Sequence, residues 1–77
     1  MALSNYDIGY MVGAMDPAIS GIETALDQLD GIMMHVHDGD ISLPTFDEAF
    51  LRSVKNDLIN THGILMSYET ELKARKE

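Results

Sequence analysis

The sequence predicts an all-α fold, an antiparallel helical hairpin of the coiled-coil type, and three observations support this prediction. Apolar residues recur in alternating steps of three and four along two long stretches, which places them in one stripe on a helix. Residues typical of helix ends flank both stretches. The composition is aliphatic and methionine-rich, with only 6% aromatic residues, whereas β-proteins favour aromatic and β-branched residues. A chain of 77 residues is expected to form one domain over residues 1–77.

The first stretch is predicted to begin with a short helix over residues 5–15. Ser4 followed by Asp7 three positions later is an N-cap pattern. Asp16 and Pro17 then form a second start signal, because proline at the first helical position lacks an N–H that would be unpaired there anyway. The apolar stripe continues in phase across Pro17, so one long helix kinked at this proline is the alternative.

The first long helix is predicted over residues 17–38. Gly39 is expected to end it, because glycine readily adopts the left-handed conformation that follows a helix C-terminus. The apolar stripe of this helix and of the segment before it consists of Ile8, Val12, Met15, Ile19, Ile22, Leu26, Leu29, Met33 and Val36.

The second long helix is predicted over residues 46–75. Thr45 and Glu48 match a capping box, in which each side chain accepts a hydrogen bond from the other residue's backbone N–H. The hydroxyl of Thr61, the one polar residue in its stripe, either bonds to its own helix backbone or helps to fix the register. The stripe consists of Leu51, Val54, Leu58, Thr61, Leu65, Tyr68 and Leu72.

The short connection from Asp40 to Pro44 forces the two long helices to run antiparallel. In the register that this connection sets, Lys55 falls near Asp30 and His62 falls near Glu23. Exposed ion pairs of this kind contribute only about 0–1 kcal/mol each. We therefore expect these two pairs to orient the helices more than they stabilise them.

The two flanks of the first stripe differ in character. One flank, named here the acidic flank, consists of Asp16, Glu23, Asp27 and Asp30. On the other flank, apolar residues widen the stripe: Ala18, Ala25 and Ile32 on the first long helix and Phe50 and Ile64 on the second. Ile59 and Met66 make a further apolar patch on the second helix. The large residues among these, Ile32, Phe50, Ile59, Ile64 and Met66, are named here the apolar set. A two-helix hairpin cannot cover this set. We expect homodimerisation into a helical bundle to do so, because small domains need additional core; the segment around Tyr6 and Tyr10, or a partner's helix, are the alternatives.

Charge is distributed unevenly along the chain. Residues 1–51 contain nine carboxylates and no Lys or Arg, and all five basic residues lie between Arg52 and Lys76. A formal charge of −8 repels nucleic acid and anionic membranes and attracts basic protein surfaces. No signal peptide pattern is visible, and no apolar run approaches the ~20 residues of a membrane span. We expect a cytoplasmic protein that binds neither nucleic acid nor membrane directly.

The sequence does not favour catalysis or a cofactor. There is no cysteine, no serine in a nucleophile turn and no glycine-rich phosphate loop. Two narrow helices rarely enclose a catalytic pocket, so we expect no enzyme and no cofactor. His35, His37 and His62 are weak candidates for metal ligands, because imidazole suits zinc. His35 and His37 would point about 200° apart on a helix, so no metal site is expected.

The favoured hypothesis is a non-catalytic acidic helical protein whose acidic flank binds a partner protein with a basic surface. Carboxylates on successive turns lie about 4–6 Å apart along the helix axis, close to the scale of phosphate spacing in a nucleic-acid strand. In size, charge and architecture the chain resembles small phage-encoded inhibitors of host defence nucleases. This resemblance implies that it occupies a nucleic-acid-binding surface of its partner.

Two alternatives use other residues. The chain also resembles helical hairpins that act as small chaperones or assembly subunits, such as the co-chaperones of secretion needles. This resemblance implies that the apolar set would hold a partner's amphipathic helix. The weaker alternative is a sensor of a metal or small ligand that uses His35, His37 and His62.

Overall fold

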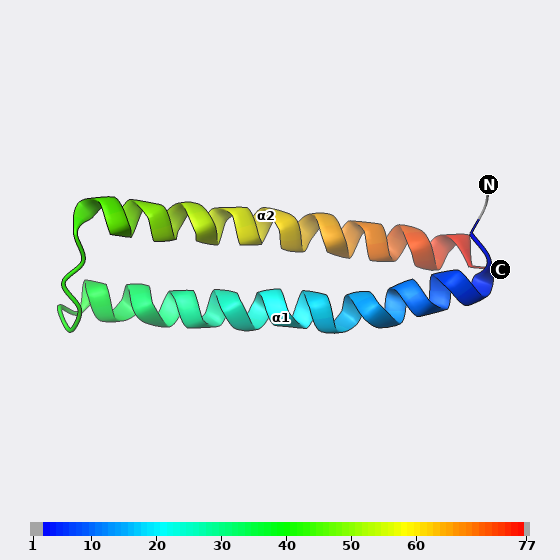
Figure 1. The fold of residues 1–77 in the computed structure, drawn as a ribbon, viewed down its shortest axis with the longest axis horizontal. Helices are drawn as coiled ribbons and strands as arrows, with labels where there is room; N and C mark the ends of the chain where they lie inside the picture. Colours follow the sequence, from blue (N-terminus) through cyan, green and yellow to red (C-terminus); the bar gives the residue numbers. More distant parts are fainter. Residues whose placement is uncertain (1–2, 77) are drawn as a thin grey trace.

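The computed structural model describes residues 3–76, which form two helices. Helix α1 spans Asn5–His37 and helix α2 spans Thr45–Arg75. The helices lie side by side and run antiparallel, so the start of α1 and the end of α2 lie at the same end of the molecule (Figure 1). The Cα radius of gyration is 17.2 Å, against about 11.5 Å for a globular chain of this length. The predicted all-α hairpin is confirmed, and its shape is an extended rod.

Helix α1 is continuous through Pro17. The prediction of a separate helix over residues 5–15 is therefore wrong, and Asp16 lies inside α1 instead of capping a second helix. The alternative of one long helix is the observed one. Ile8 and Ile19, on either side of the proline, are only 1% and 8% exposed. Because a continuous helix keeps both residues on the face that meets α2, their burial offsets the cost of about 3 kcal/mol of a proline inside a helix.

The two ends of α1 are formed as the sequence predicts. The backbone N–H of Asp7 donates to Ser4 Oγ at 3.1 Å, which confirms Ser4 as the N-cap. At the other end Gly39 has a φ of +86°, the left-handed conformation that glycine adopts without steric cost. The turn is closed by the backbone N–H of Asp40, which donates to the carbonyl of His35 at 2.9 Å.

Helix α2 begins differently from the prediction. Thr45 is already helical, and the residue before it, Pro44, makes no side-chain capping bond. The Glu48 carboxylate does not reach back to the helix start but accepts from Arg52 at 2.8 Å, one turn further on. The predicted capping box is therefore wrong. Pro44 occupies the capping position, so the threonine hydroxyl is one residue too late to cap the helix.

The interface between the helices follows the predicted stripe on α1 but departs from it on α2. Every residue of the α1 stripe is buried or half-buried. On α2, Thr61 is exposed and Tyr68 is 37% exposed, while His62 and Glu69 are half-buried in their place. A straight α-helix drifts about 20° per heptad relative to a 3.5-residue repeat. Over the length of α2 this drift turns Thr61 and Tyr68 away from α1. It brings the residues that follow them, His62 and Glu69, toward α1 instead.

Candidate protein-binding surfaces

Two ion pairs between the helices define one side of the hairpin. Lys55 Nζ lies 2.5 Å from Asp30 Oδ1, and His62 Nε2 lies 3.9 Å from Glu23 Oε1. Both pairs were predicted from the sequence and are confirmed. They also fix which residues of α1 and α2 lie level with each other along the rod, and this register is used below.

All four residues of the acidic flank are exposed on α1. Asp16, Glu23 and Asp30 follow one another at intervals of seven residues, so they lie on the same side of the helix. Asp16 and Asp27 make no ion pair within residues 3–76. Asp30 pairs with Lys55 of α2, and Glu23 lies 3.9 Å from the imidazole of His62. The flank is thus accessible along its length but only partly neutralised.

The basic residues of α2 are mostly matched within their own helix. Three ion pairs link residues four positions apart, a spacing that brings side chains together on a helix surface. They are Arg52–Glu48 at 2.8 Å, Lys73–Glu69 at 3.1 Å, and Arg75–Glu71. Because α1 contains no Lys or Arg, the unmatched negative charge of the hairpin is concentrated on α1.

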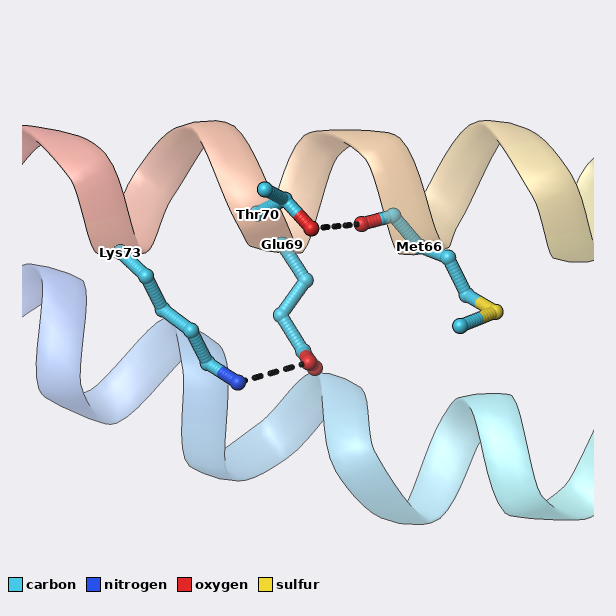
Figure 2. A network of polar contacts seen from close by, with 4 residues as sticks. All are labelled: Met66, Glu69, Thr70 and Lys73. Atoms are coloured by element: carbon cyan, nitrogen blue, oxygen red, sulfur yellow. Dashed lines mark hydrogen bonds and ion pairs between the residues drawn. The ribbon is translucent and has the colours of Figure 1, made fainter.

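Two polar side chains of α2, His62 and Glu69, lie in the interface between the helices, at the levels where the sequence predicted Thr61 and Tyr68. The side chains of His62 and Glu69 are 24% and 15% exposed. Figure 2 shows Glu69 directed toward α1, with its carboxylate bound to Lys73. Within the described part of the chain, His62 Nε2 and Glu69 Oε2 are buried without a hydrogen-bond partner. A buried, unpaired polar group costs about 1–3 kcal/mol, so this interface is weakened at Glu69, whereas His62 Nε2 keeps its contact of 3.9 Å with Glu23.

The outward surface near Glu69 shows how the neighbouring polar groups are satisfied. The Thr70 hydroxyl donates to the carbonyl of Met66 at 3.0 Å (Figure 2). The Thr24 hydroxyl does the same toward Ser20 on α1, at 3.1 Å. Such bonds satisfy threonines within their own helix, so these hydroxyls need no partner from outside.

The five residues of the apolar set are all exposed, but they do not form one face. Ile59 and Met66 each follow an ion-pairing residue of α2 by four positions, about 40° around the helix, so they lie on the ion-pair side. Ile32 and Ile64 follow Asp30 and His62 by two positions, about 200° around, and so lie on the opposite side with Phe50. Ile32 is 38% exposed, Ile59 and Met66 are 50% exposed, and Phe50 and Ile64 are 60% exposed.

We name the side opposite the ion pairs the apolar side. Ala18, Ala25 and Ile32 of α1 and Phe50, Ile64 and Tyr68 of α2 form it. The segment around Tyr6 and Tyr10 does not cover it, because this segment continues α1 and leaves its tyrosines 82% and 72% exposed. Within this chain, the segment around Tyr6 and Tyr10 was the alternative that the sequence offered for covering these residues. The apolar side can therefore be covered only by a second copy of the chain or by a different protein.

A shallow open groove runs along the outer surface of α2. Its floor consists of small residues, and its apolar walls are Ile59 on one edge and Ile64 with Tyr68 on the other. The full lining is Ile59, Asn60, Gly63, Ile64, Ser67, Tyr68 and Glu71. A Cβ atom placed on Gly63 would meet nothing within 4 Å. This groove joins the outer edge of the apolar side to Ile59, a connection that sequence periodicity did not reveal.

The structure does not bring the three histidines together. His35 Nδ1 lies 3.0 Å from Asp40 Oδ2 and fastens the turn after α1. His37 is the last residue of α1, and His62 lies in the interface beside Glu23. Within residues 3–76, no group of three or more His, Cys, Asp or Glu side chains is arranged to hold a metal ion.

These features define an all-helical two-helix hairpin with an acidic flank and an uncovered apolar side. No protein-family model, curated protein or solved structure matches the chain. In the described residues, neither helix combines the length and the apolarity that a membrane crossing requires. Any inference about function therefore rests on the surfaces of this hairpin.

Proposed function

We propose that the protein is a non-catalytic binding protein whose acidic flank binds a basic surface of another protein. The observation that carries this proposal is the separation of charge between the two helices. Helix α1 presents Asp16, Glu23, Asp27 and Asp30 to solvent and contains no Lys or Arg of its own. Of the basic residues of α2, only Lys55 pairs with this flank, at Asp30, whereas three others are already paired within α2. An exposed field of one sign attracts the opposite sign and speeds association.

The spacing of the carboxylates suggests what kind of basic surface this is. Asp27 lies about 6 Å from Glu23 and about 4.5 Å from Asp30 along the helix axis, at 1.5 Å per residue. A nucleic-acid-binding surface presents Lys and Arg side chains to phosphates at a comparable spacing of a few Å. The proposed partner is therefore a nucleic-acid-binding protein whose binding surface the hairpin occupies, as phage-type inhibitors do.

The double variant Asp16→Lys/Asp27→Lys tests this proposal. Neither aspartate takes part in an ion pair within residues 3–76, so the helical circular dichroism should stay unchanged. The immobilised wild type should capture a nucleic-acid-binding protein from a lysate of its source organism. Duplex DNA or RNA, or an increase in salt from about 50 to about 500 mM, should release that protein. The variant should bind it at least tenfold more weakly.

The matched control is Asp38→Lys/Asp47→Lys, which makes the same change in charge at two exposed positions beside the turn, outside both the acidic flank and the apolar side. It should retain partner binding within about twofold, because it leaves the acidic flank intact. Equal loss of binding by both double variants would show only a dependence on net charge. Unchanged binding by the acidic-flank variant, or a captured protein that nucleic acid does not displace, would contradict the proposal.

The second candidate function is a small chaperone or assembly subunit, in which the apolar side holds an amphipathic helix of a partner. It is favoured by the exposure of Phe50 and Ile64, which are both 60% exposed on this side. Binding of this type should be nearly insensitive to salt, whereas binding through the acidic flank should weaken strongly. Homodimerisation would use the same side, so these two occupants compete for it.

A further inference from the structure

The hairpin exposes more surface than a monomer of its mass normally does. Its accessible surface is 5687 Å², whereas a monomeric globular protein of 8.5 kDa is expected to expose about 4,700 Å². The excess is roughly 1,000 Å², and a standard protein interface removes about 800 Å² from each partner. One additional interface of ordinary size would bring the chain to the expected value.

The buried core is correspondingly small. Within residues 3–76, only Ile8, Ile19 and Leu72 are buried apolar residues. Large apolar side chains such as Phe50 and Ile64 remain more exposed than buried. Small domains without disulfides or metals generally gain the missing core by association.

We propose that the apolar side is the interface between two copies of this chain, related by a two-fold axis parallel to the helices. The result is a four-helix bundle in which α1 of each copy packs antiparallel against α2 of the other. Such an axis rotates one copy without shifting it along the rod. Residues that lie level within one chain therefore also lie level across the interface.

The register within one chain then determines which residues meet across the interface. The pairs Asp30–Lys55 and Glu23–His62 place Ile64 level with Gly21, and Tyr68 level with Pro17, beside Ala18. Ile64 and Tyr68, the two large side chains of α2, would thus meet α1 of the other copy at a level where α1 carries small side chains.

The apolar side of α1 is composed of small residues at that level. Each of these small residues lies two positions before or after a residue of the acidic flank. Two positions are about 200° around the helix, so these residues point away from the ion pairs. They are Ala14, Ala18, Gly21 and Ala25. A Cβ atom on Gly21 would meet nothing within 4 Å. Large residues on α2 that face small residues on α1 give the shape complementarity that close packing of helices needs.

The distribution of charge permits a second copy of this chain at the apolar side, although each copy carries a net charge of −8. The acidic flanks lie on the opposite side of each hairpin, so two copies can meet here without bringing those carboxylates together. Asp57, a carboxylate in the middle of the apolar side of α2, lies level with Gln28. Across the two-fold axis, the Gln28 amide can donate a hydrogen bond to the Asp57 carboxylate of the other copy.

The oligomeric state in solution is the first test. Light scattering at about 10–300 µM should give twice the chain mass of 8.5 kDa for the wild type. The variant Phe50→Asp/Ile64→Asp should be monomeric with unchanged helical circular dichroism, because both side chains are exposed in the single hairpin. A monomeric wild type, as expected if a partner's helix occupies this side, would overturn the proposal.

The control is Met34→Asp/Met66→Asp, which changes two residues that are 62% and 50% exposed on the ion-pair side. Each follows an ion-pairing residue, Asp30 or His62, by four positions. This variant should remain dimeric. Dissociation of the control, or persistence of the dimer in Phe50→Asp/Ile64→Asp, would show that the interface lies elsewhere.

Cysteine cross-linking tests the arrangement of the helices, since the chain has no cysteine of its own. Chains with Gln28→Cys and chains with Asp57→Cys should form a disulfide-linked dimer when mixed and oxidised. Neither variant should do so alone, because like helices lie diagonally across the bundle. Cross-linking of Gln28→Cys alone, or none in a mixture that is dimeric by mass, would contradict this two-fold arrangement. The dimer is independent of the proposed acidic-flank function, which uses other residues.

Discussion

At the scale of single residues, the position of Glu69 is the least expected feature of the molecule. Its carboxylate is directed toward α1, with one oxygen bound to Lys73 and the other without a partner in the described residues (Figure 2). A half-buried carboxylate loses hydration that a single exposed ion pair does not replace. Glu69 therefore lowers the stability of the hairpin at a position where an apolar residue would pack.

Glu69→Leu should raise the free energy of unfolding by about 1–2 kcal/mol, because it removes an unpaired polar atom and adds apolar contact with α1. The Lys73 side chain is 58% exposed, so it returns to water at little cost. Urea unfolding followed by circular dichroism measures the change. Glu71→Leu is the control: the Glu71 side chain is 57% exposed and pairs with Arg75, and stability should not increase. A less stable Glu69→Leu would mean that the carboxylate is better satisfied than the structure shows.

At the scale of secondary-structure elements, α1 continues through a proline that would normally interrupt a helix. Local signals at Asp16 and Pro17 favour a new helix start, and packing of the apolar stripe on α2 favours continuity. The structure shows that packing dominates here, since Ile8 and Ile19 are both buried. The conflict leaves α1 with a missing backbone hydrogen bond in its interior.

Pro17→Ala should therefore stabilise the hairpin, by up to about 3 kcal/mol, because it restores that hydrogen bond and relieves the clash of the proline ring with the preceding turn. Pro17 is exposed, so the substitution should not disturb the packing. Thermal unfolding gives the measurement, and Pro44→Ala, which changes a proline before α2, is the control with a much smaller gain expected. A loss of stability in Pro17→Ala would indicate that the proline shapes α1 for packing.

At the scale of the whole molecule, the hairpin is a rod of 53 × 17 × 13 Å with two unlike sides. The ion pairs and the acidic flank lie on one side, and the apolar side lies opposite them. A dimer formed through the apolar side would carry two acidic flanks, both directed outward. Such a dimer could bind two partner surfaces, or one symmetric partner, with increased avidity.

Association linked to folding makes thermal stability depend on concentration. The midpoint of thermal unfolding of the wild type should rise by several degrees between about 5 and about 500 µM chain. The midpoint of Phe50→Asp/Ile64→Asp should be the same at both concentrations and close to that of the wild type at the lower one. A wild-type midpoint that does not change with concentration would contradict a dimer that forms on folding.

Most of the secondary structure could be predicted from the sequence, because its determinants are local. The step of three and four residues identifies helices, Ser4 and Gly39 mark the ends of α1, and the short connection makes the helices antiparallel. The pairs Asp30–Lys55 and Glu23–His62 followed from the same pattern. The same pattern separated Ile59 and Met66 from the flank that contains Ile32, Phe50 and Ile64, and all five residues are exposed. Whether these surfaces bind a partner stays a prediction.

The sequence by itself determined two amphipathic helices, their antiparallel order and the concentration of acid on α1, because periodicity, capping and charge are properties of neighbouring residues. Only the tertiary structure decided that α1 continues through Pro17, since burial of Ile8 and Ile19 against α2 outweighs a local stop signal. It also decided that His62 and Glu69, and not Thr61 and Tyr68, face α1. That choice depends on the drift of a straight helix against a seven-residue repeat, which accumulates over the whole length of α2.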